Sequence, residues 1–370
     1  MTSSLVSVLG IDVPILQSGM GGVAGPELAA AVANAGGLGT LAALRLTPDQ
    51  IRRSVGKIRA ATDRPFAMNL WLHAELLHPA EPEEVGSDIL GEIDSVLNEV
   101  RTELGLERRT TRAPANGVHP NDAIEVMLEL RVPVFCAAIG LASAELVDRC
   151  HSAGTVVVNM VATVDDASQA VANGVDVVVA QGSEAGGHRS YGSKRQRIDA
   201  SGTGSMALIP AVVDAIGEQV PVVAAGGIVD GRGLAAAMML GAQGVLLGTR
   251  FVATKESTAS ELWKRQLVEA SGPPKLTDAF TGQWAKTLPA TFADRYAEAN
   301  APTLPGLMQS VAAADIFAAA KAAEDPDHQP LYAGDAAPLI ADLPGAGDAV
   351  ASIVAEAEQA LGRPLLTEAG

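Results

Sequence analysis

The strongest constraint on this chain is a regular alternation of short apolar runs with stretches of helical spacing. The runs are mostly continuous instead of alternating with polar residues, which is typical of parallel strands covered by helices on both faces. Eight such runs over about 235 residues predict an α/β fold, the (β/α)8 TIM barrel, whose usual size is ~250 residues. The eight runs are residues 13–16, 38–41, 65–70, 132–137, 155–159, 175–180, 220–225 and 243–247.

An open, doubly wound sheet is the alternative arrangement of the same elements. Its dinucleotide-binding form carries G-x-G-x-x-G after an early strand. Here the first run is followed by Gly19-Met20-Gly21-Gly22, which lacks that spacing. The barrel is therefore the preferred prediction.

Two segments depart from an idealised barrel. Residues 71–131 form a long insertion after the third strand, with helical spacing in 89–104 and 123–130. After Phe251 the strand pattern stops, and helices are expected at 258–270, 306–323 and 345–361. We expect a barrel over residues 1–255 and a C-terminal helical region over residues 256–370, packed over the barrel.

Composition excludes several classes of protein. The net charge is −17 at pH 7, whereas a nucleic-acid-binding protein needs positive charge to displace phosphate counterions. The N-terminus has no basic segment ahead of a long apolar run, and runs such as 175–180 are far shorter than the ~20 residues of a membrane-spanning helix. Two cysteines, Cys136 and Cys150, cannot form a secreted disulfide framework. We expect a cytoplasmic protein that binds neither nucleic acid nor membrane.

Loops that follow the strands of a TIM barrel build its active site. The first such loop is 17–22, where glycines would let backbone amides approach a flat ligand. Asn69 ends the third strand and offers an amide that donates and accepts. Both features also fit ordinary turns. The chain has 38 glycines and only 3% aromatic residues, which favours close helix packing and ligand sites lined by backbone.

The loop after the sixth strand, residues 181–189, contains His188 among glycines. An imidazole with its ordinary pKa of ~6.5 exchanges protons near neutrality, so His188 is the candidate acid or base. The other five histidines fall in the insertion, at a helix end or in the tail, and are expected at the surface. Glu184 is expected to be a local structural partner and not a catalytic acid.

Glycine-containing loops also follow the seventh and eighth strands, at 224–228 and 248–250. With the N-terminus of a following helix, here 231–240, such loops form the recurrent phosphate site of this fold. They predict a phosphorylated cofactor or substrate. The cations Arg189, Lys194, Arg195 and Arg197 are either solvated or attract an anionic ligand. H-E-x-x-H and C-x-x-C are absent, and no metal is expected.

Three blocks of sequence carry a resemblance to a known family. They are residues 31–39 (AVANAGGLG), residues 180–189 (AQGSEAGGHR), and residues 221–228 (PVVAAGGI) continuing to Gly248-Thr249. Together they resemble the nitronate monooxygenases, formerly called 2-nitropropane dioxygenases, which are FMN-dependent TIM-barrel enzymes. The resemblance runs from about Pro14 to Lys321.

The resemblance implies oxidation of alkyl nitronates or nitroalkanes by O2 to carbonyl compounds and nitrite, with His188 as the active-site histidine. Gln17 to Met20 would border the flavin ring, Asn69 would hydrogen-bond the flavin, and Gly227 with residues 246–249 would hold the ribityl phosphate. The complete set expected to bind FMN is Gln17, Ser18, Gly19, Met20, Asn69, Gln181, Gly186, Gly187, Gly226, Gly227, Leu246, Leu247, Gly248 and Thr249.

The substrate side departs from the family's pattern. Ala138 stands where members commonly carry a histidine on the fourth strand, and Phe317 stands where a tyrosine precedes Lys321 by four residues. Ala138, Phe317 and Lys321 are therefore the residues assigned to the substrate pocket.

Relatives that share the Ala-Gly-Gly-His loop also include NAD(P)H-dependent flavin reductases, which act on enoyl thioesters or quinones. Such a reductase is the alternative function, for which the cationic loop 189–197 would suit a phosphate of the substrate. A flavin- or phosphate-binding barrel without turnover is a third reading. The physiological substrate and the oligomeric state stay open.

Overall fold

The computed structural model describes residues 4–78, 84–111, 114–115, 118, 120–191 and 202–365. Eight parallel strands form one sheet in the order β1-β9-β8-β6-β5-β4-β3-β2, and a parallel bridge between Leu16 and Leu38 joins the two ends. The fold is therefore the predicted TIM barrel, and each predicted run overlaps its strand. The strands are β1 (Ile15–Gln17), β2 (Gly39–Ala42), β3 (Phe66–Trp71), β4 (Val134–Ala138), β5 (Val156–Val161), β6 (Val177–Gln181), β8 (Val222–Ala225) and β9 (Gly244–Leu247).

A ring of helices covers the barrel, and small residues bring it close to the strands. A Cβ at Gly39 would collide with the carbonyl of Ala29, so α2 can lie directly on β2. α3 begins with a capping box between Thr47 and Gln50, which satisfies two backbone N–H groups of its first turn. The ring contains α2 (Pro26–Asn34), α3 (Pro48–Ala61), α6 (Pro120–Glu129), α7 (Ala144–Ser152), α8 (Val164–Ala172), α9 (Ser205–Ile216) and α10 (Gly231–Met239).

The N-terminal helix α1 (Leu5–Leu9) closes the end of the barrel opposite the loops that carry the candidate site. Leu5 and Leu9 are buried in one cluster with residues of the barrel interior such as Leu16, Val134 and Val177. The backbone N–H of Leu5 donates to the side chain of Gln243, just before β9. The candidate site therefore lies at the end of the barrel that α1 leaves uncovered.

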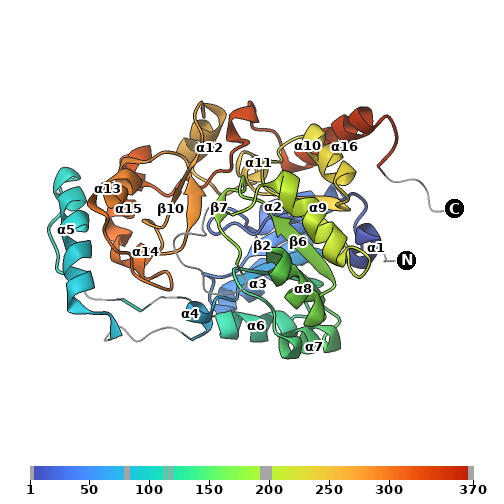
Figure 1. Cartoon of the computed structure of the whole chain (residues 1–370), viewed down its shortest axis with the longest axis horizontal. Coiled ribbons are helices and arrows are strands. Elements are labelled where there is room, and N and C mark those ends of the chain that lie inside the picture. Colours follow the sequence, from blue (N-terminus) through green and yellow to red (C-terminus); the bar gives the residue numbers. More distant parts are fainter. Residues whose placement is uncertain are drawn as a thin grey trace.

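A second hydrophobic core lies beside the barrel, on the side away from both termini (Figure 1). Phe280, Phe292 and Phe317 pack on one another there, and Ile93 and Leu97 of the insertion complete the cluster. We call α5 together with residues 279–322 the side lobe. Its helices are α5 (Ser87–Glu103), α13 (Thr291–Ala299), α14 (Met308–Ala312) and α15 (Ala314–Ala322), while the short α4 (Ala74–Leu77) leads into the insertion.

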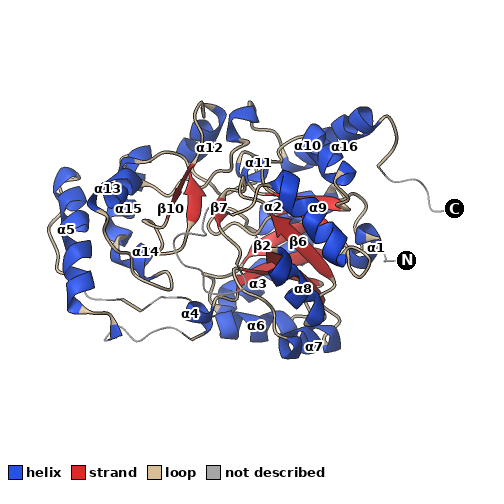
Figure 2. Cartoon of the chain, in the orientation of Figure 1, coloured by secondary structure: helices blue, strands red, loops and turns tan. Residues whose placement is uncertain are grey.

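The expectation that strands stop after Phe251 is wrong. β10 (Lys275–Thr277) and β11 (Ala285–Thr287) form an antiparallel pair, and β11 also pairs with β7 (Gly187–His188) from the loop after β6. This three-stranded sheet lies between the barrel and the helices of the side lobe (Figure 2). Segments of two or three residues are too short to show a periodicity, and Lys275 and Lys286 interrupt any apolar run.

The C-terminal region contributes helices both to the side lobe and to the ring around the barrel. α12 (Glu261–Val268) lies within a predicted helix, and the predicted helix at 345–361 is α16 (Ala346–Leu361). α16 packs against α10 and α2 in the ring around the barrel. The division of the chain between residues 255 and 256 stays a prediction. No helix in the described part of the chain is long and apolar enough to cross a membrane.

Candidate active site

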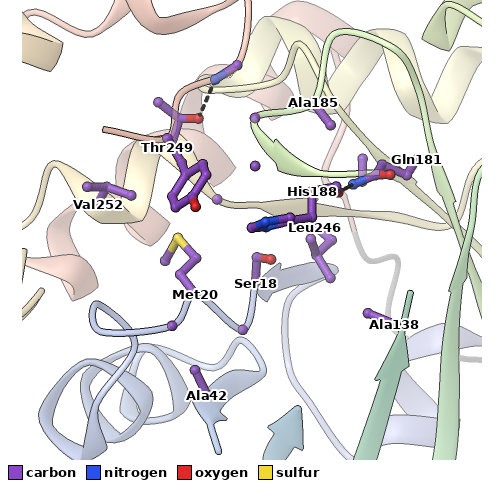
Figure 3. Close-up of a pocket in the computed structure, with 18 of the residues that line it drawn as sticks. Ser18, Met20, Ala42, Ala138, Gln181, Ala185, His188, Leu246, Thr249 and Val252 are labelled. Atoms are coloured by element: carbon purple, nitrogen blue, oxygen red, sulfur yellow. Dashed lines mark hydrogen bonds between the residues drawn. The ribbon is translucent and has the colours of Figure 1, made fainter. Parts of the chain in front are cut away.

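A cavity of about 450 Å³ opens at the ends of the strands where TIM barrels carry their active sites (Figure 3). Most of the predicted residues line it. They are Ser18, Gly19, Met20, Asn69, Ala138, Gln181, Gly186, Gly187, His188, Gly226, Gly227, Leu246, Gly248 and Thr249. The strand-end rule therefore brings together residues that lie far apart in the sequence.

Glycines let the loops at this end approach one another closely. A Cβ at Gly19 would collide with the side chain of Asn69. A Cβ at Gly186 would lie 2.5 Å from the backbone of Ala333, and one at Gly226, where φ is +104°, would lie 2.9 Å from the amide of Ala185. Any side chain at these positions would displace a neighbouring segment, so the cavity walls here are backbone.

Three side-chain amides stabilise these walls through hydrogen bonds. Gln17 is fully buried behind the cavity, where its Oε1 accepts from the N–H of Thr40 at 2.8 Å and its Nε2 donates to the carbonyl of Ser18. Asn69 donates to the carbonyl of Cys136 at 2.9 Å. Gln181 donates to the carbonyl of His188 at 2.9 Å (Figure 3). The last bond ties the histidine's backbone to the end of β6.

His188 lies between two aromatic rings. Its ring centroid is 4.5 Å from that of Trp71 and 5.1 Å from that of Tyr332. Its Nε2 lies 2.8 Å from Oγ1 of Thr281, and its backbone pairs with Ala285 of β11. Burial, with a smaller repulsion from Arg45, lowers the pKa of His188 to about 3. The imidazole is therefore neutral at physiological pH.

Arg45 is the cation among the described residues that line the cavity, and the sequence reasoning missed it. It follows β2, lines the cavity, and donates to Oγ of Ser310 at 3.0 Å. Among the residues that the structure describes, no carboxylate forms an ion pair with Arg45. Its cationic charge is thus available to an anionic ligand.

The strand-end rule would have found two of the missed residues. Arg45 follows β2 and Trp71 ends β3, so both stand where that rule looks for function. Thr281, Tyr332 and Trp263 also line the cavity but come from the C-terminal region. No local pattern marks these three residues.

The hydrogen bonds of Arg189 and Glu184 indicate that both side chains stabilise local structure. Arg189 is buried, and its guanidinium donates to the carbonyls of Ser183 and Ala185. It therefore stabilises its own loop instead of presenting charge to a ligand. Glu184 accepts from the backbone N–H and hydroxyl of Ser205, which confirms the local role expected for it. The other predicted cations, Lys194, Arg195 and Arg197, lie outside the described residues.

We expected the N-terminus of the helix at 231–240, which is α10, to help bind a phosphate. The contacts of α10 contradict this expectation. The N–H of Gly233 donates to Asp230, and the N–H of Gly231 donates to Glu356 at 3.0 Å. Two carboxylates thus occupy the first turn of α10. The loops themselves do face the cavity, where Oγ1 of Thr249 accepts from the N–H of Gly334 at 3.1 Å (Figure 3).

The remaining predicted residues do not line the cavity. Leu247 is buried beneath it on β9. Phe317 packs against Phe280 and Phe292 in the core of the side lobe, and Lys321 is exposed on α15. Of the three residues assigned to the substrate pocket, the structure brings only Ala138 to the cavity.

Known proteins of one family resemble the chain over nearly its whole length. The sequence model of the nitronate monooxygenase family matches residues 2–356. A probable nitronate monooxygenase of Staphylococcus haemolyticus is 35% identical over 308 residues, which cover 82% of this chain and 83% of that protein. One from Staphylococcus aureus strain Newman is 33% identical over 308 residues, with 81% and 82% covered.

Solved structures give the same result. Nitroalkane oxidase from Streptomyces ansochromogenes superposes with a TM-score of 0.84 at 32% identity, covering 97% of this chain and 99% of that one. FabK from Thermotoga maritima superposes with a TM-score of 0.73 at 27% identity, covering 98% of each chain. By sequence and by fold, the chain belongs to the nitronate monooxygenase family and is an oxidoreductase.

Proposed function

We propose that this protein oxidises alkyl nitronates with O2, giving carbonyl compounds and nitrite, and that FMN is its cofactor. The observation that carries the proposal is that His188 and Arg45, a cation without a carboxylate partner among the described residues, line one glycine-walled cavity. A nitronate is an anion, which Arg45 would attract. It has already lost its α-proton, so it needs no strong base. We also propose, from the sequence, that the reaction takes place in the cytoplasm.

The lining residues fit FMN in shape and chemistry. A volume of about 450 Å³ lies within the usual range for small-molecule sites. Gly19, Gly186 and Gly226 let neighbouring segments approach closely, so the cavity is lined there by backbone against which a planar ring can lie. When bound, FMN would supply the electron acceptor for the substrate. Ser18, Gly19, Met20, Asn69, Gln181, Gly186 and Gly187 would hold its ring, and Gly226, Gly227, Leu246, Gly248 and Thr249 its ribityl phosphate, with Gln17 and Leu247 supporting them from behind.

The remaining lining residues would bind and orient the substrate. Trp71 and Tyr332 flank His188 and, with Ala138, give apolar surface for an alkyl chain. Arg45 would hold the anionic nitro group by a charge-assisted hydrogen bond. His188 would orient the nitronate, or accept the α-proton when a neutral nitroalkane is offered. Because its pKa is about 3, we expect the nitroalkane to react more slowly.

Oxygen uptake by flavin-loaded protein tests the proposal. Addition of a preformed alkyl nitronate should consume O2 and release nitrite, while the matching neutral nitroalkane should react more slowly. Loaded protein that consumes no O2 with any nitronate would overturn the assignment.

Anaerobic mixing with NADH and NADPH tests the alternative function, an NAD(P)H-dependent flavin reductase. Rapid bleaching of the flavin absorption would favour the reductase. An unchanged spectrum, together with oxygen uptake on nitronates, would favour the oxygenase.

A further inference from the structure

Thr281 contacts His188 from a part of the chain that no motif marks. It follows β10 in the C-terminal region, whereas His188 belongs to a loop of the barrel. The two side chains meet at 2.8 Å between Oγ1 and Nε2. Trp71 and Tyr332 flank the imidazole ring, so the histidine has little freedom to turn away from this contact.

The core of the side lobe holds Thr281 in place. Thr281 is only 5% exposed, and the preceding Phe280 stacks on Phe292 with ring centroids 5.1 Å apart. The following Gly282 has φ of +80°, and a Cβ there would collide with the carbonyl of Leu304. Both neighbours of Thr281 are therefore fixed by packing, and its hydroxyl oxygen stays at a fixed position beside the imidazole.

The hydrogen bonds around Thr281 distinguish the two neutral forms of His188. Oγ1 accepts from the N–H of Gln283 at 3.3 Å and lies 3.2 Å from the carbonyl of Gln283. If Nε2 carries the proton, it donates to Oγ1, and the hydroxyl then donates to that carbonyl. If Nε2 is bare, the hydroxyl must donate to it, and the carbonyl loses this donor. The first arrangement satisfies one more partly buried polar group, which stabilises it.

We propose that Thr281 is a positioning residue that holds His188 as the Nε2–H tautomer and leaves Nδ1 as the proton acceptor. Nδ1 has no hydrogen-bond partner within the described part of the chain. This inference rests on the proposed function for its role in turnover. With a neutral nitroalkane, the α-C–H bond breaks, its proton passes to Nδ1, and the electron pair stays on the nitronate. With a preformed nitronate no proton moves to His188.

Nitrogen NMR of ¹⁵N-histidine-labelled, flavin-loaded protein tests the tautomer directly. The chain has six histidines, and a His188→Gln variant identifies the signals of His188. In the unaltered chain Nδ1 should give a pyridine-type signal and Nε2 a pyrrole-type signal. Thr281→Val, which keeps the shape but removes the hydroxyl, should shift both signals towards the average of two tautomers. Thr281→Ser should preserve the original pattern.

Turnover supplies the second measurement. Thr281→Val should lower the rate on a neutral nitroalkane by ~10-fold, since one hydrogen bond orders the base, and lower the rate on the nitronate by a smaller factor, since no proton passes to His188 there. Thr281→Ser should restore the nitroalkane rate. A pyrrole-type Nδ1 in the unaltered chain, or equal losses on both substrates, would overturn the proposal. Should neither substrate be oxidised, the proposed function fails, while the nitrogen signals still decide the role of Thr281.

Discussion

Arg45 and His188 are two ionisable side chains of the cavity, and at the scale of single residues they make separate predictions. Arg45 brings a cation without a carboxylate partner in the described structure, and His188 brings a ring that burial keeps neutral. A net charge of −17 makes the molecule as a whole repel anions. Arg45 is therefore the local feature that favours an anionic substrate.

Replacing Arg45 should weaken the binding of anions specifically. We expect Arg45→Met to raise KM for a nitronate by ~10- to 100-fold, the effect of losing a hydrogen bond to a charged group, with Arg45→Lys intermediate. KM for the corresponding neutral nitroalkane should change much less. Steady-state kinetics on both substrates measure this difference, and equal increases in the two KM values would show that Arg45 only shapes the cavity.

His188 should make the stability of the protein depend on pH. Burial, and secondarily Arg45, lower its pKa to about 3 in the folded protein, whereas the unfolded chain binds the proton at about 6.5. Between these values the unfolded state holds more protons, so the free energy of unfolding rises with pH. We expect stability to fall as the pH is lowered from 6.5 towards 3. Denaturant unfolding at a series of pH values should show a shallower slope for His188→Gln, and an identical slope would contradict the assignment.

At the scale of elements, glycine determines where helices can approach. The first residue of α10, Gly231, faces α16, and a Cβ there would collide with the amide nitrogen of Ala357. Gly56, within α3, has no heavy atom near the place of its Cβ. The two glycines therefore form a matched pair, one required by packing and one not.

Substitution of these two glycines by alanine should have opposite effects. We expect Gly231→Ala to lower the free energy of unfolding by ~1–3 kcal/mol, because α16 must move. Gly56→Ala should raise it by ~0.5–1 kcal/mol, because alanine loses less backbone entropy in a helix. Denaturant titration of both variants checks the pair. If Gly231→Ala leaves the free energy of unfolding unchanged, α16 does not pack on α10 as described.

The barrel strands were predictable because each is an apolar run buried on both faces, such as 175–180 for β6. β7, β10 and β11 were not, because segments of two or three residues are held by partners distant in the sequence. The same distinction applies to the site. Gly186, His188 and Thr249 follow barrel strands and could be located by rule, whereas Thr281 and Tyr332 reach the cavity only through the packing of the C-terminal region.

At the scale of the whole molecule, an ion pair connects the insertion to the C-terminal region. Arg101 of α5 is 2% exposed, and its Nε lies 3.0 Å from Oδ2 of Asp315 on α15. The same guanidinium donates to the carbonyl of Ala312 at 2.9 Å. These contacts join two segments that the barrel separates in sequence, and they border the aromatic core that holds Phe280.

Removing this buried cation should destabilise the side lobe. We expect Arg101→Met to lower the free energy of unfolding by ~1–3 kcal/mol, because the carbonyl of Ala312 loses its donor and Asp315 keeps only the more exposed Arg109, at 3.5 Å. Arg52 also pairs with a carboxylate, Glu129, but both side chains are largely exposed. Arg52→Met should therefore change stability by less than ~1 kcal/mol. Unfolding followed by tryptophan fluorescence compares the two, and similar small losses would show that the lobe does not depend on Arg101.

Because β7 pairs with β11, the surroundings of His188 are completed late in the synthesis of the chain. The ribosome completes the last barrel strand, β9, before it has made Thr281, Ala285 and Tyr332. The glycines that follow β1, β6 and β8 are already present at that stage, whereas His188 still lacks its strand partner, its hydroxyl contact and one of its flanking rings. A nascent chain thus contains the strand-end glycines of the cavity before it contains the C-terminal residues that surround His188.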